Sequence, residues 1–444
     1  MTLLETIKSD YSKFTLYSLI ELGLSYTKQA KYCNLNSWTL ATYLEWAYAY
    51  TDNASNKKIA NGKDFNTICN SIFKLMNGHP LSNFKHNNPK KLFHVLAYQQ
   101  FPFQNGLTLQ DFSRQDYLFS FLEFNQEFKQ QTNFSVNSFL TLLFKIWVWI
   151  DEKGFESLLP QKEQDQLFTE LSSFVNLLSI KHNLGNQEII KHRTQLFFET
   201  EEYYAFRPDF FVKHPFIEFN NELFFIHKGL FIRTIQEYLF KSLCDLENEI
   251  TRRCFDKRFE DYFSIGLIAL NIQHKRETCL KNIYPNVEVC DYVIEDFLFA
   301  ECKAIQLKAL AQVNPTDKIL KNSFKLISKA YQQIVSTANI LNSNKESFGV
   351  ILTYHPFYFS DGTDIWDEFL KEHIENYVKE KNYHLLIPPE NLFFIDIKSW
   401  DELINILNDK KVTLKEVLNR AKINNANSST QKFTFDLHLT QYKT

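Results

Sequence analysis

Three ionisable residues stand close together in an apolar stretch of the sequence. Asp291 lies in the segment 287–294, VEVCDYVI, and Glu301 and Lys303 lie in the segment 297–305, FLFAECKAI. Side chains alternate between the two faces of a strand, so Glu301 and Lys303 are expected on the same face. A buried charge is costly unless it is paired or binds a metal ion. The three groups therefore need a chemical explanation.

Metal-assisted hydrolysis accounts for this combination of residues. Two carboxylates on one face can hold a hard divalent cation such as Mg²⁺ or Mn²⁺ through oxygen atoms. The cation would act as a Lewis acid and lower the pKa of a bound water molecule. A lysine beside the carboxylates would orient the attacking water or neutralise charge on a phosphate. Asp291 and Glu301 are therefore the candidate metal ligands, and Lys303 is the candidate catalytic lysine.

The order of these residues, Asp and then Glu-x-Lys on the following strand, resembles the motif of the PD-(D/E)xK nuclease superfamily, also called restriction-endonuclease-like. The matching residues are Asp291, Glu301 and Lys303, and Cys290 stands where the proline of the motif would be. The resemblance extends over residues 250–408. It implies a Mg²⁺-dependent endonuclease with DNA as the expected partner, acting in defence against foreign DNA or in repair.

The resemblance also implies two further site residues. In the superfamily, the helix before the hairpin often contributes an acidic residue, and Glu260 in RFEDYF takes that position ahead of Asp261. The helix after the Glu-x-Lys strand often carries a glutamine, as in the RecB-like branch, and Gln333 in AYQQI is the candidate. That branch has a tyrosine four residues later, whereas this chain has Thr337.

A stripe of lysines runs along the helix that is expected over residues 314–341. With about 100° of rotation per residue, four lysines fall on one side of this helix. Such a stripe is usually a solvated face, but beside a phosphodiester-cleaving site it could equally bind the nucleic-acid backbone. The four residues are Lys318, Lys321, Lys325 and Lys329.

The loop of the hairpin sets a condition for the metal site. A two-residue turn would pair Ile294 with Phe297 and would turn Asp291 away from Glu301. The two carboxylates converge only if the loop has an odd number of residues or a bulge shifts the register. We therefore predict a bulge, or a three-residue loop over 295–297.

The sequence patterns divide the chain of 444 residues into four segments. Residues 1–185 have helical periodicity and are predicted to form a helical domain of unknown role. Residues 186–245 contain a β-hairpin pattern. Residues 246–410 read α-β-β-α-β-α-β-α, which predicts an α/β domain, and the resemblance implies a restriction-endonuclease-like αβββαβ-type core. Residues 411–444 are expected to be a polar tail ending in a short strand.

Composition limits the remaining possibilities. The net charge is −3, so any nucleic-acid surface must be local. The chain has seven cysteines and no CxxC pair, which argues for reduced thiols and against structural zinc. No apolar run reaches the roughly 18 residues of a membrane span, and a cytoplasmic protein is expected. A homo-oligomer or a partner protein remains open.

Two alternatives to the enzyme remain at this point. The chain could be a catalytically inactive nucleic-acid-binding or assembly protein that keeps a nuclease-like fold. Alternatively, Asp291, Glu301 and Lys303 could form a structural ion cluster. The presence of all three residues favours the enzyme over the inactive protein.

Overall fold

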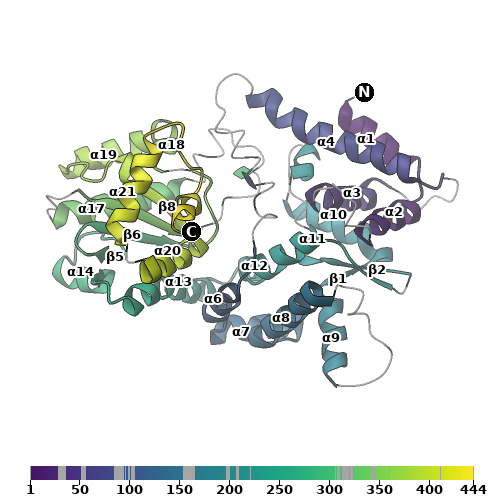
Figure 1. The fold of residues 1–444 in the computed structure, drawn as a ribbon, viewed down its shortest axis with the longest axis horizontal. Helices are drawn as coiled ribbons and strands as arrows, with labels where there is room; N and C mark the ends of the chain where they lie inside the picture. Colours follow the sequence, from purple (N-terminus) through teal and green to yellow (C-terminus); the bar gives the residue numbers. More distant parts are fainter. Residues whose placement is uncertain are drawn as a thin grey trace. The chain divides into compact units, whose positions relative to one another are not determined.

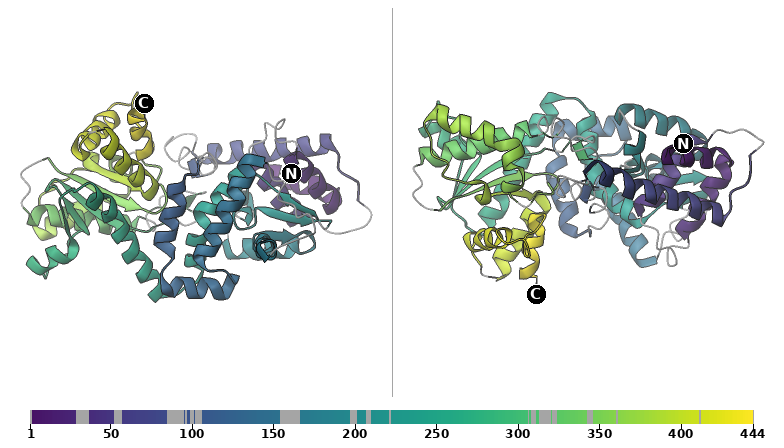
Figure 2. Two further views of the ribbon diagram at one scale, coloured as in Figure 1. Left: turned by 60° about the horizontal axis from the view of Figure 1, so that its bottom comes forward. Right: turned by 90° about the horizontal axis from the view of Figure 1, so that it is seen from above.

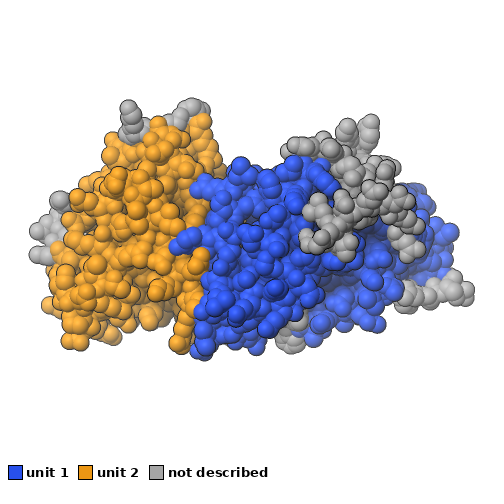
Figure 3. Space-filling view, turned by 90° about the horizontal axis from the view of Figure 1, so that it is seen from below, with its two compact units in different colours: residues 1–251 blue, residues 252–444 orange. Residues whose placement is uncertain are grey.

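The computed structural model divides the chain into two compact units, Met1–Thr251 and Arg252–Thr444, which are coloured separately in Figure 3. The residues that the structure describes are 2–28, 37–51, 57–84, 95, 97–98, 101, 106–153, 166–196, 201–206, 210–220, 222–305, 307, 311–312, 320, 324–341, 346–359, 361–410 and 412–443. Both units combine helices with one small mixed sheet, so the chain is a mixed α/β protein.

Helices make up most of the first unit (Figure 1). The first three lie where the sequence predicted helices, and α1 begins with a capping box between Thr2 and Glu5. Large aromatic side chains such as Trp46 on α3 and Phe65 on α4 are fully buried. The helices are α1 Leu3–Ser12, α2 Leu16–Lys28, α3 Ser37–Tyr50, α4 Gly62–Phe84, α6 Leu109–Phe119, α7 Leu122–Thr132, α8 Val136–Lys153, α9 Gln166–Leu177, α10 Gly185–Leu196, α11 Phe210–Lys213 and α12 Lys228–Asp245.

A three-stranded sheet completes the first unit. Its strands are β1 Ser179–Lys181, β2 Phe216–Phe219 and β3 Glu222–Phe225. β1 is parallel to β2, and β2 is antiparallel to β3. The predicted hairpin over 186–245 is confirmed by the pairing of β2 with β3. Asn220 has a left-handed φ of 53°, which suits a tight turn, and Asn221 lies outside the described residues.

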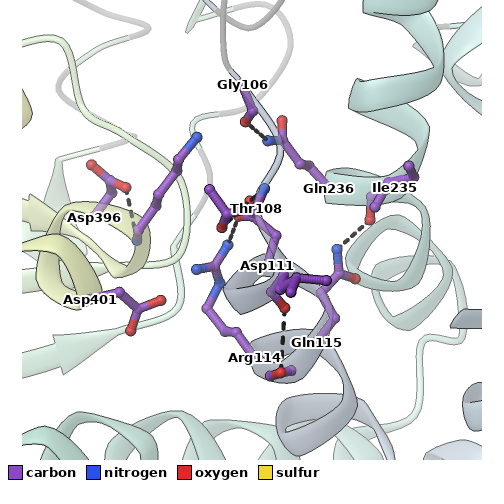
Figure 4. A network of polar contacts seen from close by, with 12 residues as sticks. Gly106, Thr108, Asp111, Arg114, Gln115, Ile235, Gln236, Asp396 and Asp401 are labelled. Carbon is purple, nitrogen blue, oxygen red and sulfur yellow. Dashed lines mark hydrogen bonds and ion pairs between the residues drawn. The ribbon is translucent and has the colours of Figure 1, made fainter. Parts of the chain in front are cut away.

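A buried polar network fixes the start of α6 in the first unit (Figure 4). Asp111 is fully buried and accepts a hydrogen bond from the backbone N–H of Thr108 at 2.7 Å. The same carboxylate forms an ion pair with Arg114. Gln115 donates to the carbonyl oxygen of Ile235 on α12. The network thus satisfies the first turn of α6 and connects it to α12.

One pair of helices in the first unit has the length and apolar character of a broken membrane span. No single helix among the described residues is long and apolar enough to cross a membrane, and one bent pair, Leu122–Thr132 with Val136–Ile150, passes by length and composition alone. The bend between the two helices of this pair is 63°. Phe124 and Phe139 of this pair are fully buried.

The second unit is built on a five-stranded sheet with the order β4-β5-β6-β7-β8. Figure 2 shows the ribbon of this unit, in green to yellow, from two further sides. β4, β5 and β6 are antiparallel neighbours, whereas β6, β7 and β8 run parallel. β6 and β7 are buried along nearly their whole length, as strands covered on both faces are. The strands are β4 His274–Arg276, β5 Tyr292–Ile294, β6 Leu298–Lys303, β7 Phe348–Thr353 and β8 Leu392–Asp396.

Helices alternate with these strands along the chain. α17 packs on β6 and β7, and α20 packs on β7 and β8. Phe263 of α13 stacks on Trp400 of α20 with ring centroids 4.1 Å apart. The helices are α13 Glu249–Ala269, α14 Glu277–Ile283, α17 Lys325–Ile340, α18 Thr363–Ile365, α19 Lys371–Lys381, α20 Ile397–Lys410, α21 Leu414–Asn425 and α22 Phe435–Leu439, and the π-helical turn Trp366–Leu370 precedes α19.

Two features of the second unit differ from the sequence expectation. β4 is an additional strand, and its sequence His-Lys-Arg carries no apolar alternation because it forms an edge of the sheet. The strand predicted over 287–294 is only Tyr292–Ile294, because side chains take over the backbone hydrogen bonds before it. The backbone N–H of Cys290 donates to the hydroxyl of Thr337 on α17 at 2.7 Å.

The end of the chain also differs from the expectation of a polar tail with a strand. α21 begins with a capping box between Thr413 and Glu416. Within the segment FTFDLHL, residues 433–439, Phe435–Leu439 form the helix α22. Phe435 and Leu439, four residues apart, are both buried, whereas Phe433 is 41% exposed. The apolar residues of this segment are therefore buried at the four-residue spacing of a helix, and not at the two-residue alternation that predicted a strand.

Candidate active site

Three acidic residues of the second unit lie at neighbouring strands: Glu277 directly follows β4, Asp291 directly precedes β5, and Glu301 lies on β6. Arg276 pairs with Tyr292 between β4 and β5, and one step further the N–H of Glu277 donates to the carbonyl of Asp291 at 2.7 Å. Tyr292 pairs with Ala300 between β5 and β6, so the same step places Asp291 opposite Glu301. Residues directly opposite each other in antiparallel strands share a face. The acidic row is thus Glu277, Asp291 and Glu301.

The hairpin loop that produces this register has three residues. Ile294 pairs with Leu298, which leaves Glu295, Asp296 and Phe297 between the strands. Glu295 and Asp296 have left-handed φ values of 47° and 56°. The N–H of Phe297 donates to the carbonyl of Ile294 at 3.2 Å and closes the loop. The prediction of an odd-numbered loop is therefore confirmed.

The carboxylates of Asp291 and Glu301 are held by the backbone of the opposite strand. The N–H of Asp291 donates to Oε2 of Glu301 at 3.1 Å, and the N–H of Cys302 donates to Oδ2 of Asp291 at 2.7 Å. Nζ of Lys303 donates to Oε1 of Glu301 at 2.5 Å. Glu301 is fully buried, whereas the side chain of Lys303 is 28% exposed. The structure therefore brings together the three residues of the predicted motif.

Burial dominates the electrostatics of this cluster. It raises the pKa of Glu301 to about 8, helped by the negative charge of Asp291 and opposed by Lys303. It raises the pKa of Asp291 to about 6, again opposed by Lys303. Burial would lower the pKa of Lys303, but Glu301 and Asp291 outweigh it, so that pKa is raised. Removal from water thus disfavours the doubly ionised carboxylate pair, which a cation would stabilise.

Glu260 on α13 lies within electrostatic reach of the row. Burial raises its pKa to about 7, and the charges of Asp291 and Glu277 add to this shift. The hydroxyl of Tyr292 donates to the carbonyl of Glu260 at 2.8 Å and ties α13 to β5. The neighbouring Asp261 instead pairs with Arg276, 2.7 Å from Nη1. Glu260, rather than Asp261, is the helical acid coupled to the site.

Gln333 positions the chain just before Asp291. Its Nε2 donates to the carbonyl of Val289 at 3.3 Å. Among the described residues, Oε1 of Gln333 is buried and has no hydrogen-bond partner. One turn later, Thr337 accepts from the N–H of Cys290 and donates to the carbonyl of Gln333 at 2.8 Å. The predicted glutamine therefore contacts the backbone that leads into the site, rather than the carboxylates.

Two of the four lysines of the predicted stripe are among the residues that the structure describes. Lys325 and Lys329 lie on α17 and are exposed. Lys318 and Lys321 lie outside the described residues, as does much of the predicted helix before Leu320. The backbone-binding role of these lysines stays a prediction.

Sequence reasoning missed three charged residues around the site. Burial raises the pKa of Asp256, and the positive charges of Arg252 and Lys303 oppose this shift. Asp256 stands four residues before Glu260 on α13, and this helical spacing was the available signal. Glu277 and Lys281 on α14 are also four residues apart and form an ion pair. They lie close to Asp291 because β4 pairs with β5. The sequence of β4 does not alternate between polar and apolar residues, so it did not predict a strand.

The carboxylate oxygens of the site suit one mode of metal binding. Within the described part of the chain, no group of three or more His, Cys, Asp or Glu side chains is arranged to hold a metal ion. Mg²⁺, however, is usually bound through one or two carboxylates, with water and substrate phosphates as the other ligands. The buried oxygens of Asp291 and Glu301, which meet across the hairpin, fit that mode of binding.

Comparisons with known proteins add no further constraint. No family model, no curated protein and no solved structure matches this chain.

Proposed function

We propose that the second unit is a metal-dependent nuclease that hydrolyses phosphodiester bonds, with DNA as the expected substrate. The observation that carries this proposal is the meeting of Asp291 and Glu301 across the hairpin, with the ammonium of Lys303 2.5 Å from Glu301. Burying two carboxylates and a lysine at one point requires the desolvation of charged groups, which is unfavourable in a core that has only a structural role. A hydrolytic role would account for the presence of all three at one point.

The order of the elements supports a restriction-endonuclease-like core for this unit. Along the chain it runs α13, β4, α14, β5, β6, α17 and β7, which corresponds to the order αβββαβ of that fold with one short helix, α14, added between the first two strands. β4, β5 and β6 are antiparallel neighbours, and β7 joins β6 in parallel after the helix α17. Asp291 directly precedes the second of these strands, and Glu301 and Lys303 lie on the third.

The chemistry divides between the cation and the side chains. When bound, Mg²⁺ or Mn²⁺ would lower the pKa of a water molecule and stabilise charge at phosphorus. Asp291 and Glu301 would bind the ion, and Lys303, which reaches solvent, would orient the water or the scissile phosphate. In the reaction the water molecule gives up a proton as its oxygen forms a bond to phosphorus, the bond between phosphorus and the 3′ oxygen breaks, and the 3′ oxygen takes up a proton. Glu260, with its pKa raised to about 7, can exchange such a proton near neutral pH.

One observation favours the second candidate, a catalytically inactive nucleic-acid-binding protein. Lys303 already neutralises Glu301 through a direct ion pair, which reduces the need for a metal ion. In that case nucleic acid would bind through the exposed Lys325 and Lys329 and would not be cut.

The deciding experiment uses purified protein with plasmid, linear duplex DNA, single-stranded DNA and RNA. Each is incubated with Mg²⁺, with Mn²⁺ or with a chelator. We expect cleavage that depends on the metal and disappears in Glu301→Gln. The matched control is Glu295→Gln, because Glu295 is exposed in the same hairpin loop. Binding without cleavage by the wild type under every metal would support the inactive protein instead.

A further inference from the structure

Lys281 is a second lysine at the acidic row, and it is more accessible than Lys303. It lies on α14, one turn after Glu277, and its Nζ is 2.6 Å from Oε1 of that residue. The side chain of Lys281 is 52% exposed, against 28% for Lys303. Lys303 is bound to a fully buried carboxylate, whereas the partner of Lys281 is itself in contact with solvent.

The backbone fixes the position of this pair relative to the site. Glu277 directly follows β4, and its N–H donates to the carbonyl of Asp291 at 2.7 Å. The bond to Glu277 raises the pKa of Lys281, and the negative charges of Asp291 and Glu301 add to that shift. The ammonium of Lys281 is therefore within electrostatic reach of both candidate metal ligands.

The two lysines differ in how much stability is lost when each leaves its carboxylate partner. Freeing Lys303 would leave the charge of Glu301 buried and uncompensated, which is strongly destabilising. Freeing Lys281 from Glu277 breaks a solvent-exposed ion pair on one helix, and such pairs contribute little to stability. Lys281 can thus change partners easily when a stronger anion arrives. A phosphate, with its oxygen acceptors and full charge, is such an anion.

We propose that Lys281 is a substrate-positioning residue that exchanges Glu277 for a backbone phosphate of the nucleic acid beside the metal site. Glu277 holds the ammonium in place when no substrate is bound. This inference rests on the proposed function only in taking nucleic acid as the substrate, and it does not require that cleavage occurs.

Binding rather than cleavage tests the proposal. The probes are a short fluorescein-labelled DNA duplex and its single strand, followed by anisotropy with the full chain over a range of salt concentrations. Lys281→Gln should weaken binding of the preferred probe roughly tenfold at about 0.1 M salt and reduce the salt slope by about 1. The control is Lys275→Gln, because Lys275 is 54% exposed on β4 and pairs at 3.1 Å with Asp296 of the hairpin loop, which is not a member of the row.

A second pair of variants tests the exchange of partners. Glu277→Gln should tighten binding more than Asp296→Asn, which removes the same charge from the partner of Lys275. The extra gain should vanish in the double variant Glu277→Gln with Lys281→Gln. A structural role for the pair would instead lower the melting temperature without changing the salt slope.

The outcomes separate this inference from the nuclease proposal. If Lys281→Gln and Lys275→Gln have the same affinity and salt slope, the inference is wrong even where the wild type cuts DNA. If the wild type binds but does not cut, and Lys281→Gln alone flattens the slope, the inference stands while the nuclease proposal fails. If the wild type binds neither probe, the inference fails.

Discussion

The backbone N–H of Asp291 donates directly to the carboxylate of Glu301, at 3.1 Å from Oε2. Asp291 in turn receives the N–H of Cys302 on its own carboxylate. Each acidic side chain therefore accepts a hydrogen bond from a main-chain N–H of the facing segment, and Glu301 accepts a further one from Lys303. Among substitutions only proline removes a backbone N–H, so this orientation survives most single changes around the site. Such preorganisation is what a metal site requires.

Replacing Glu301 with alanine should separate catalysis from binding. We expect cleavage to fall by at least about a hundredfold, because one of the two candidate metal ligands is removed. Nucleic-acid affinity should change little, because surface cations supply most of it. Mg²⁺ should raise the melting temperature of the wild type, since it binds the native state, and much less that of the variant. Equal shifts in both proteins, with cleavage retained, would falsify the assignment of Glu301.

The raised pKa of Glu301 predicts a pH dependence of the metal-free protein. Burial raises this pKa in the folded state from about 4.5 to about 8. When the pKa of a carboxyl is higher in the folded than in the unfolded protein, its protonated form stabilises the fold. This stabilisation is complete at a pH below the pKa of the unfolded protein and is lost as the pH rises through the pKa of the folded protein. The melting temperature of the wild type should therefore decline relative to Glu301→Gln between about pH 4.5 and 8. Parallel pH profiles for the two proteins would show that burial does not control this carboxylate.

The stabilising effect of Mg²⁺ should have the opposite pH dependence. The ion needs ionised carboxylates, and the pKa values of Asp291 and Glu301 are raised to about 6 and about 8. The gain in melting temperature on adding Mg²⁺ should therefore increase across this interval. A gain that is constant over the same interval would place the ion elsewhere.

Thr337 should stabilise the segment before Asp291 through its hydroxyl. Thr337→Val keeps the shape but leaves the buried N–H of Cys290 without its acceptor, which costs about 1–3 kcal/mol in the free energy of unfolding. Thr337→Ser keeps the hydroxyl and should remain close to the wild type. Urea denaturation measures both, and a Thr337→Val variant as stable as the wild type would show that the hydroxyl does not support this segment.

Asp111 should be essential for the stability of the first unit. Asp111→Ala leaves Arg114 without this carboxylate in a buried setting and removes the acceptor for Thr108. We expect a decrease of about 3–5 kcal/mol in the free energy of unfolding. Asp116→Ala is the control, because Asp116 lies on the same helix at a half-buried position and should cost much less. Similar decreases in the two variants would contradict the role of the buried pair.

Charge reversal on α17 tests the predicted backbone track. Lys325→Glu with Lys329→Glu should weaken nucleic-acid binding and reduce the salt slope by about 1 for each phosphate that these lysines neutralise in the wild type. Reversal of Lys379 and Lys381, which lie on α19, changes the net charge equally and is the control. If both double variants bind alike, the stripe is a solvated face.

Local patterns in the sequence determined several parts of this protein. The spacing of Glu301 and Lys303 places both side chains on one face, because strand side chains alternate with a period of two. The need for Asp291 to face Glu301 required an odd loop, and the three-residue loop follows that parity. The first helices of the chain were predictable for the same reason, since a residue's neighbours at three and four positions share its face.

Only the tertiary structure decided which distant groups complete the site. β4 has no apolar pattern, yet its pairing with β5 brings Glu277 and Lys281 to the carboxylate row. The segment before Asp291 looked like strand, but the hydroxyl of Thr337 takes the hydrogen bond of Cys290. These outcomes depend on which distant donor meets which acceptor. A linear pattern of polar and apolar residues does not encode that choice, because long-range backbone and side-chain partners compete for the same hydrogen bonds.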